Sequence, residues 1–429
     1  MQCQILSIGD ELLIGDTVNT NASWMARELT EIGVEVNRIY TIKDDLAGIK
    51  EIVNEALSSA DVVFTTGGLG PTHDDMTKQA IAELLDSELV VHEPTLDFIK
   101  KIFKERNIPF SKSNYHQAEV IEGCEVLFNE QGTAPAMWFD HEGALLVVLP
   151  GVPYEMKHLM NHHILPRLKK KIGNKTYRAS HYMLTAGIGE STLSDEIIGD
   201  LNPFLNGNDI SLAYLPSPEG TRIRIRGQAS TEQKLKDQME TLIGHIKKQA
   251  DGFIVGEGKQ IRLAEKVGES LQEVGLKIAV AESCTGGSVA NSLTDIPGSS
   301  NYFKGGIIAY ENEVKVNQLK VNANDLQQQG AVSKAVALQM AKGVAQQLNA
   351  HIGISTTGIA GPEGGTDKKP VGTVWIGFWS EDQHFAIRAQ FTNDRLINKQ
   401  RTTATALEMV RRILLDISEM PYGLKKQLA

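Results

Sequence analysis

Cysteine is scarce in this chain of 429 residues: three occur, far apart in the sequence, as Cys3, Cys124 and Cys284. An odd number at such distances predicts no disulfide framework, and no Cys-x-x-Cys pair suggests a metal site. Long apolar runs are also missing, since no stretch of about 18 apolar residues occurs and the opening residues MQCQILSIGDELL contain no basic leader with an apolar core. We therefore expect a protein of the reducing cytoplasm that has no membrane partner.

Positive charge is in short supply as well, because 43 lysines and arginines face 53 aspartates and glutamates. The formal net charge of −10 provides no broad positive field, so the composition predicts no nucleic-acid partner. A local phosphate site remains open to such a chain, since backbone amides and one or two basic groups are enough to bind a small anion.

Short β-type runs and helical runs alternate in the first part of the chain. The runs Gln4–Ile8, Val34–Thr41 and Asp61–Thr66 predict strands, and the runs Asn21–Ile32 and Leu46–Ser59 predict the helices between them. Strands and helices that alternate over short links indicate a parallel sheet covered on both faces. Ligand sites of such folds gather at the carboxyl ends of the strands.

The pattern changes twice further along, and 429 residues exceed one ordinary core. A basic stretch at residues 167–175 precedes short runs typical of a small α+β unit, and a second alternating α/β pattern begins near Gly258. We predict two separate α/β domains joined by a small α+β domain, with bounds of 1–170, 171–255 and 256–420.

A serine at a strand-to-helix junction stands out in the C-terminal part. The segment Ala281–Gly287, AESCTGG, follows the predicted strand Lys277–Ala281. Its small and hydroxyl residues leave backbone amides for an anion or oxyanion, and Ser283 is a candidate nucleophile provided that a base lies within reach. The alternative is a helix N-cap, a role that serine often has. This segment alone leaves both open, with the cap as the commoner case.

Two more polar stretches follow predicted strands in the same part of the chain. Gly305–Lys315, GGIIAYENEVK, places Tyr310 and Lys315 after a strand, and Ser355–Thr366, STTGIAGPEGGT, is a loop rich in glycine and threonine. Glycines in such a loop let the backbone approach a ligand closely. Three polar loops at strand ends of one small α/β unit predict a ligand site.

With GAVS and KPVGTVWIG, which stand in the same order, these motifs make Glu265–Leu415 similar to the CinA C-terminal domain. The resemblance implies the activity associated with that family, the hydrolytic deamidation of nicotinamide mononucleotide to nicotinate mononucleotide and ammonia. It implies Ser283 as the catalytic serine and Lys315 as its basic partner, with Tyr310 as an orienting residue. No metal or other cofactor is implied at this site.

The implied reaction requires a lysine that can act as a base and residues that bind the substrate phosphate. A lysine ordinarily has a pKa of about 10.4, so the base needs a pKa lowered by desolvation or by a second cation. We expect Arg401 to pair with the substrate phosphate bidentately, with Arg395 as the less favoured rival, and Cys284 to be a packing residue. The residues expected to bind substrate here are Thr285, Gly286, Gly287, Thr357, Gly361, Gly364, Gly365, Thr366 and Arg401.

The informative N-terminal stretches are Gly9–Leu13, Asn19–Asn21 and Gly67–Thr77, the last with the sequence GGLGPTHDDMT. Glycines ahead of Thr-x-Asp-Asp at a strand-to-helix junction suit a phosphate against a helix start, with carboxylates placed for a divalent ion. Alternatively, Asp74 and Asp75 are first-turn acids favoured by the helix dipole.

Together with LPGVPYEMK at Leu149–Lys157, these stretches make residues 1–165 resemble the molybdopterin-binding-like domain of CinA proteins, a relative of the MoaB/MogA fold. The resemblance implies a metal-dependent ADP-ribose pyrophosphatase that gives AMP and ribose 5-phosphate. Its divalent metal, of open identity, would be held by Asp10, Glu11, Asp74 and Asp75, of which Asp10 and Asp74 are also the catalytic candidates. The expected substrate contacts are Gly68, Gly70, Thr72 and Asn21, with Glu155 and Asn114 as weaker candidates.

One position departs from the family pattern: GTAPG is usual where this chain has GTAPA, ending at Ala136. The added methyl is expected to affect the pocket shape and not the fold. The middle segment resembles the KH-like connector of the same family and is expected to space the domains without binding RNA. The family and the commonness of isologous pairs also predict a homodimer.

The leading hypothesis is a bifunctional enzyme whose substrates are nicotinamide mononucleotide and ADP-ribose. Two alternatives stay open from the sequence. One is a molybdopterin-binding protein, based on the N-terminal resemblance, and the other is a competence-associated protein without enzymatic activity.

Overall fold

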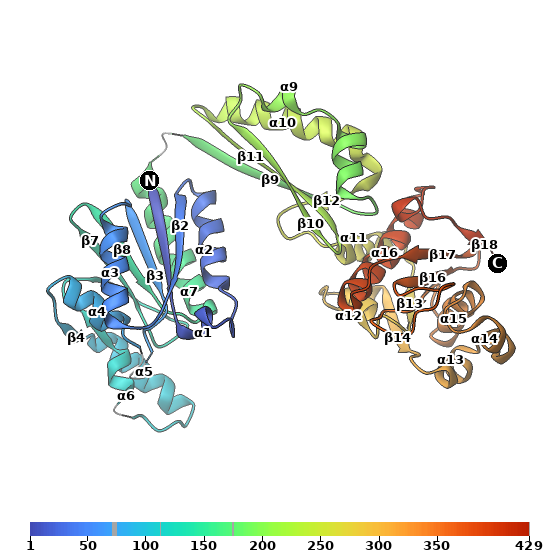
Figure 1. Ribbon diagram of the computed structural model, residues 1–429, viewed down its shortest axis with the longest axis horizontal. Helices are drawn as coiled ribbons and strands as arrows, with labels where there is room; N and C mark the ends of the chain where they lie inside the picture. The colour runs from blue at the N-terminus through green and yellow to red at the C-terminus, as the bar shows by residue number, and fades with distance from the viewer. Residues whose placement is uncertain (71–74, 112, 174–175, 429) are drawn as a thin grey trace. The chain divides into compact units, whose positions relative to one another are not determined.

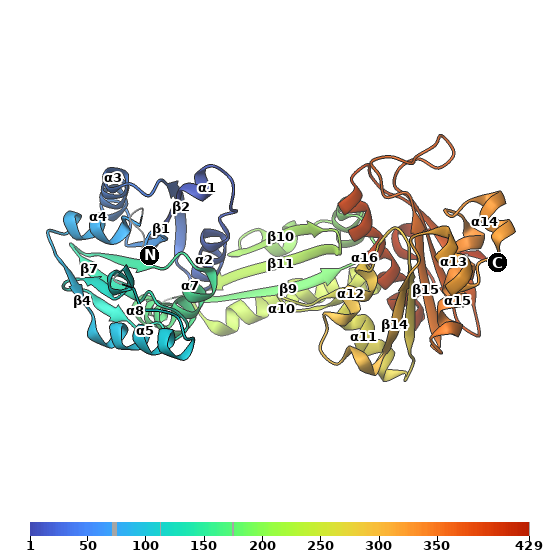
Figure 2. The ribbon, with the colours of Figure 1, turned by 90° about the horizontal axis from the view of Figure 1, so that it is seen from below.

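The computed structural model of the protein describes residues 1–70, 75–111, 113–173 and 176–428. They form two compact units, Met1–Arg178 and Ala179–Ala429, coloured from blue to green and from green to red in Figures 1 and 2. Within the described residues, none of the helices combines the length and the apolar character that a membrane span requires.

A mixed sheet of six strands forms the centre of the first unit, in the order β2-β1-β3-β8-β7-β6. The pairs β1–β2, β1–β3 and β3–β8 are parallel, whereas β7 pairs antiparallel with both β8 and β6. A separate antiparallel pair joins β4 to β5. The strands are β1 (Gln2–Ile8), β2 (Glu35–Ile42), β3 (Val62–Thr66), β4 (Leu89–Val91), β5 (Glu119–Ile121), β6 (Glu125–Leu127), β7 (Ala136–His141) and β8 (Ala144–Leu149).

Helices cover both faces of this sheet because its strands are apolar on both sides. On β1, Ile5 belongs to the core shared with α2, α7 and α8, whereas Leu6 belongs to the core shared with α3 and α4. Such continuous apolar strands are typical of a parallel sheet covered on both faces, as the sequence predicted. The helices are α1 (Asp10–Leu13), α2 (Thr20–Glu31), α3 (Leu46–Leu57), α4 (Thr77–Leu84), α5 (Glu93–Glu105), α6 (Ser113–Gln117), α7 (Pro153–Leu159), the π-helical turn η1 (Met160–Ile164) and α8 (Leu165–Ile172).

The second unit begins with a four-stranded sheet, in the order β10-β11-β9-β12, and α10 packs against it. Strand β11 alternates buried and half-buried residues along most of its length, so one of its faces meets the helical layer. The elements are β9 (Tyr177–Thr185), η2 (Thr192–Ile198), α9 (Asn202–Leu205), β10 (Ile210–Ser217), β11 (Gly220–Ala229), α10 (Glu232–Ala250), η3 (Asp251–Phe253) and β12 (Ile254–Glu257).

A second six-stranded sheet follows, in the order β14-β13-β15-β16-β17-β18. Its first three strands are parallel and the other pairs are antiparallel. Helices α11, α12 and α16 share the core on one face, and α13 and α15 share the core on the other. The strands are β13 (Ile278–Glu282), β14 (Phe303–Ile308), β15 (Ile352–Gly358), β16 (Thr373–Trp379), β17 (His384–Gln390) and β18 (Gln427–Leu428). The helices are α11 (Leu263–Glu273), α12 (Ser288–Thr294), η4 (Ser299–Asn301), α13 (Asn312–Leu319), α14 (Ala323–Gln329), α15 (Lys334–Gln347), α16 (Arg395–Leu414) and η5 (Pro421–Gly423).

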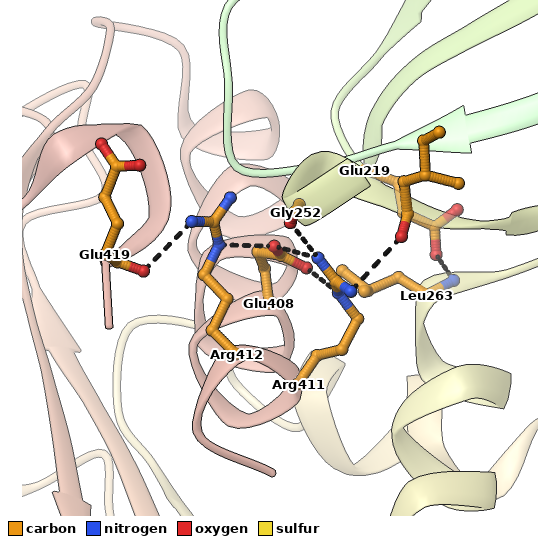
Figure 3. A network of polar contacts seen from close by, with 8 residues as sticks. Glu219, Gly252, Leu263, Glu408, Arg411, Arg412 and Glu419 are labelled. Atoms are coloured by element: carbon orange, nitrogen blue, oxygen red, sulfur yellow. Dashed lines mark hydrogen bonds and ion pairs between the residues drawn. The ribbon is translucent and has the colours of Figure 1, made fainter. Parts of the chain in front are cut away.

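A buried ionic network on α16 joins this helix to η3 of the small region and to the loop at Glu419 (Figure 3). Glu408 accepts hydrogen bonds from Arg411 Nε and Arg412 Nε, each at 2.7 Å, and all three side chains are almost fully buried. Arg411 Nη2 also donates to the Gly252 carbonyl at 3.0 Å, and Arg412 Nη1 donates to the Glu419 carbonyl at 3.0 Å. Removing one partner of such a network leaves a buried charge uncompensated, which costs about 3–5 kcal/mol.

The predicted fold class is confirmed, because two mixed α/β sheets flank a small α+β region along the chain. The compact units divide the chain once, after Arg178, and the second unit holds both the small region and the second α/β sheet. The finer division into 1–170, 171–255 and 256–420 stays a prediction.

Candidate functional sites

The strand-end turn that carries Ser283 is held by the residue before it. Glu282, the buried last residue of β13, accepts hydrogen bonds from the backbone of Gly287 (2.8 Å), Val289 (3.1 Å) and Ala290 (2.8 Å). The carboxylate therefore sits at the start of α12, where an acidic group is favoured. The alternative of Ser283 as the helix cap is wrong, since α12 begins at Ser288 with Gly287 as its N-cap.

These hydrogen bonds to Glu282 correct one expectation about the backbone amides of the turn. Gly287 N–H donates to Glu282, and Gly286 N–H donates to the Ser283 carbonyl at 3.1 Å, so both are engaged within the protein. In the described residues no hydrogen bond engages Thr285 N–H. Thr285 N–H, with the neighbouring Cys284 N–H, is thus the remaining candidate donor for an oxyanion.

Lys315 is a buried lysine, with 1% of its surface exposed, in the first turn of α13. Its Nζ donates to two backbone carbonyls, Ala309 at 2.8 Å and Tyr310 at 2.9 Å. Burial lowers the pKa of this ammonium, and the nearby Glu311 carboxylate opposes the shift. Desolvation is thus the source of the lowered pKa that a lysine base requires.

Backbone pairing places Lys315 beside the serine turn. The Ala309 N–H donates to the Glu282 carbonyl at 2.8 Å, and the Ala309 carbonyl accepts from Lys315 Nζ. Ser283 follows Glu282 directly and is itself largely buried. Among the described residues, no hydrogen bond joins Ser283 Oγ to Lys315 Nζ in this structure.

The neighbouring strand β15 contributes threonines with different surroundings. Thr356 Oγ1 and Thr285 Oγ1 are 2.6 Å apart, and the Thr356 carbonyl accepts Ser283 N–H at 2.9 Å, so β15 supports the serine turn. Thr357 Oγ1 donates to the Ala331 carbonyl at 2.8 Å. The predicted substrate contact Thr357 is buried, whereas Gly364, Gly365 and Thr366 are exposed. Burial raises the pKa of the Cys284 thiol to about 12, which keeps it protonated and suits a packing role.

The cations of α16 differ from those expected. Arg395 Nη1 donates to the Gly361 carbonyl at 2.8 Å, and its Nη2 donates to the exposed Tyr310 hydroxyl at 2.9 Å. The favoured Arg401 lies elsewhere, in a cavity of about 430 Å³ lined mainly by residues of the small region and the C-terminal end. The less favoured Arg395 is the arginine that joins two of the predicted loops.

Sequence reasoning missed Lys399, which lies one helical turn after Arg395 on α16. A Cβ atom added to Gly286 would lie 3.6 Å from Lys399 Nζ, so this ammonium faces the serine turn. The four-residue spacing from Arg395 to Lys399 is the signal that was available, because residues i and i+4 share a helix face.

A cavity of about 500 Å³ in the first unit collects most of the N-terminal candidates. It lies at the carboxyl ends of β1, β3 and β8, where such a fold places its ligands. Asp74 and Thr72 lie outside the described residues. The predicted residues that line this cavity are Asp10, Glu11, Asn21, Gly68, Gly70, Asp75 and Glu155.

An additional carboxylate, Asp44, lines the same cavity and was missed. Its N–H donates to Asp10 Oδ1 at 3.2 Å, and its own Oδ1 accepts the Met76 N–H at 2.9 Å. Asp75 Oδ1 accepts the Gly70 N–H at 2.9 Å. Asp44 is far from the glycine loop in the sequence, so no local pattern predicted this contact. The contact depends on which strand ends lie side by side in the fold.

Two of the predicted contacts have roles within the protein. The Asn21 side-chain amide donates to the Gly151 carbonyl at 2.7 Å and to Thr66 Oγ1 at 3.2 Å. Gly68 has φ +64°, and an added Cβ would lie 2.1 Å from Thr77 Oγ1. Both its backbone angle and its close neighbour require glycine at this position.

Ala136, the residue that departs from the family pattern, does not line the cavity. Ala136 begins β7 with its methyl buried in the core, and the cavity is lined by Ala134 from the same loop. Glu155 is buried there, and burial raises its pKa while a hydrogen bond from Asn129 Nδ2 at 2.7 Å lowers it. The weaker candidate Asn114 contacts Ser111 and lines no part of the described cavity.

The described members of the expected metal-ligand set do not form a compact cluster of donor atoms. Within the described residues, the group of three or more potential ligands whose donor atoms all lie within 4.8 Å is Glu130, His158 and His163. Asp10, Glu11 and Asp75 surround the cavity without meeting that spacing.

Three family models match this chain. They are a CinA C-terminal domain over residues 260–414, a probable molybdopterin binding domain over residues 4–170, and a damage-inducible protein CinA KH domain over residues 180–256.

The matches to similar proteins cover nearly the whole chain. A CinA-like protein of Chloroherpeton thalassium is 42% identical over 422 residues, which cover 96% of this chain and 99% of that protein. A CinA-like protein of Salinibacter ruber is 41% identical over 415 residues, covering 96% and 100%. The crystal structure of the competence/damage inducible protein CihA from Agrobacterium tumefaciens is 35% identical, covers 37% of this chain and 94% of that one, and has a TM-score of 0.35. Because relatives at this level of identity match it from end to end, this chain belongs to the CinA family.

Proposed function

We propose that this chain hydrolyses the carboxamide of nicotinamide mononucleotide, giving nicotinate mononucleotide and ammonia, with Ser283 as nucleophile and Lys315 as base. One observation carries the proposal: a buried lysine with a lowered pKa lies beside the strand-end turn that presents this serine. A serine is activated by an adjacent base, and a desolvated lysine is one of the groups able to act in that way.

The hydrogen bonds of Lys315 are compatible with the neutral amine that a base requires. A neutral amine has two N–H donors and one lone pair, and the carbonyls of Ala309 and Tyr310 provide two acceptors. The lone pair is then the position left for the Ser283 hydroxyl.

The reaction would proceed in two halves with balanced protons. Ser283 Oγ attacks the carboxamide carbon while Lys315 takes the hydroxyl proton, and the negative oxygen turns to the N–H groups of Cys284 and Thr285. The protonated lysine then gives that proton to the amide nitrogen, which leaves as ammonia. A water attacks the resulting ester with the lysine again as base, releasing the carboxylate and restoring Ser283.

Cations on α16 support a substrate that carries phosphate. Arg395 joins Tyr310 to the Gly361 loop, and Lys399 faces Gly286. Arginine and lysine are the side chains that bind phosphate by charge-assisted hydrogen bonds. The proposal therefore assigns phosphate binding to Arg395 and Lys399 in place of Arg401.

The test is product analysis with nicotinamide mononucleotide, following ammonia and nicotinate mononucleotide together. Wild type is expected to form both in equal amounts, and Ser283→Ala to lose turnover. Ser292→Ala is the matched control, because this serine lies on α12 and its Oγ donates to the Ser288 carbonyl. Unchanged turnover in folded Ser283→Ala would contradict the proposal.

We also propose a second activity at the cavity of the first unit, the hydrolysis of ADP-ribose to AMP and ribose 5-phosphate. The observation in its favour is that Asp10, Glu11, Asp44 and Asp75 surround one cavity with Gly68 and Gly70. A divalent ion held by these carboxylates would neutralise the pyrophosphate charge. Incubation with ADP-ribose and Mg²⁺ tests this, and Asp10→Asn is expected to lose AMP formation. Tight binding of molybdopterin without hydrolysis would instead favour a binding protein.

A further inference from the structure

A cluster of one glutamate and two histidines lies in the first unit, apart from the residues that line its cavity. Glu130 is in the loop between β6 and β7, His158 is on α7, and His163 is on η1. The three donor atoms all lie within 4.8 Å of one another, and each side chain is partly open to solvent. The cluster thus offers an ion three ligand atoms.

A π-helical turn is what brings the two histidines together. Residues five apart lie about 140° from each other around an α-helix, so His158 and His163 would point in different directions there. In this chain Leu165 N–H donates to the Met160 carbonyl, the five-residue hydrogen bond of a π-helix. The ring centroids of His158 and His163 lie 6.3 Å apart as a result. Such turns are rare and frequently occur at functional sites.

Of the two histidine contacts with Glu130, one has the length of a hydrogen bond and the other is too long for one. His158 Nε2 is 2.8 Å from Glu130 Oε2, whereas His163 Nε2 is 3.8 Å from the same oxygen. The longer distance is no hydrogen bond, and His163 Nε2 is buried with no hydrogen-bond partner among the described residues. In tetrahedral zinc sites, with bonds of about 2.0–2.1 Å, neighbouring ligand atoms lie about 3.3 Å apart, between the two distances.

We propose that Glu130, His158 and His163 bind a divalent transition-metal ion of the zinc class. Two imidazoles and one carboxylate are a ligand set that zinc accepts, with water in the fourth position. The ion would fix the loop after β6 to α7 and η1. Asn129, next to Glu130, donates to Glu155 Oε2 at 2.7 Å, and Glu155 lines the cavity of the first unit. The site would therefore hold one wall of that cavity in place.

Zinc binding to the untagged full chain tests the proposal. Equilibrium dialysis with elemental analysis is done in excess Mg²⁺, which prefers oxygen ligands and competes for the carboxylates of the cavity. We expect one zinc ion per chain. His163→Ala leaves the His158–Glu130 pair intact and is expected to weaken zinc binding by at least about a hundredfold, because even residues that only support a ligand contribute about 10- to 100-fold.

His162→Ala is the matched control, because this exposed histidine is adjacent in sequence and outside the ligand set, although its ring centroid lies 4.5 Å from that of His158. It is expected to keep zinc binding near that of wild type. Thermal unfolding provides a second measurement: zinc is expected to raise the Tm of wild type and His162→Ala, and not that of His163→Ala. Equal zinc binding by wild type and His163→Ala, or no zinc on folded wild type, would overturn the proposal. Either result is independent of the two hydrolytic activities.

Discussion

Each of the two units contains a buried lysine whose Nζ donates to two backbone carbonyls. In the first unit, Lys78 on α4 is 7% exposed and donates to the carbonyls of His116 and Glu119. In the second, Lys315 is 1% exposed and donates to the carbonyls of Ala309 and Tyr310. Burial is the largest cause of a lowered pKa in both, to about 8 for Lys78.

The difference between the two lysines lies in their neighbours. Lys315 lies beside the turn of Ser283, a group that a base could activate, whereas Lys78 joins α4 to the segment around β5. Lys78 is absent from the residues that line the cavity of its unit. A lowered pKa thus marks burial, and the adjacent nucleophile is what turns it into a prediction of catalysis.

The largest expected effect comes from removing one lysine at a time. Lys315→Met is expected to lower kcat for nicotinamide mononucleotide by about a thousandfold, within the range of about 10²–10⁴ for a positioned base. Lys78→Met is the counterpart and is expected to leave that kcat within about twofold, since its unit contains no residue of the serine site. Steady-state kinetics on both variants, with circular dichroism to verify folding, makes the comparison. Similar losses in the two variants would contradict a special role for Lys315.

The next largest effect is expected from metal removal, which should lower the activity of one region and not that of the other. Chelation should lower ADP-ribose hydrolysis by at least about a hundredfold, because a metal supplies several kcal/mol of charge stabilisation to a phosphoryl transition state. Deamidation is expected to stay within about twofold, since its proposed groups are serine, lysine and backbone amides. Both rates are measured before chelation, after it, and after Mg²⁺ is restored. If chelation abolishes deamidation and added Mg²⁺ restores it, the assignment of a metal-independent deamidation site is contradicted.

A smaller effect is expected from the two arginines of α16. Arg395→Ala should raise KM for nicotinamide mononucleotide about tenfold or more, because a hydrogen bond to a charged group contributes about 1.5–3 kcal/mol. Arg401→Ala should change KM by less than about twofold, since Arg401 lines the other cavity. The ratio of the two KM values is the measurement, and a larger rise in Arg401→Ala would restore the original expectation.

The smallest signal concerns the pH dependence of stability in the first unit. The pKa of Lys78 is lowered from 10.5 to about 8, so between these values the unfolded chain binds more protons than the folded one. Stability should therefore rise with pH across this window, by at most about 3 kcal/mol, and the full penalty is present below it. Denaturant unfolding at pH values across the window measures the slope, which should be shallower in Lys78→Met. An equal slope in both proteins would contradict the shift.

Much of the fold was predictable because it depends on local patterns. The runs Gln4–Ile8 and Asp61–Thr66 became the inner strands β1 and β3, extended or trimmed only at their ends. Their apolar residues alternate between two buried faces, which is why continuous runs appeared in the sequence. The turn at Ser283 and the loop at Gly361 were also placed correctly at the carboxyl ends of strands.

The sequence by itself determined the family, the order of the sheets and the loops at which candidate residues gather, because motif spacing and apolar period are properties of neighbouring residues. Only the tertiary structure decided which groups meet. It turned Arg395 and not Arg401 toward the predicted loops, brought Asp44 into the first cavity, and engaged the amides of Gly286 and Gly287 within the protein. Those outcomes depend on how a helix is rotated about its axis and on which strand ends, far apart in the sequence, lie side by side. A local sequence pattern contains neither.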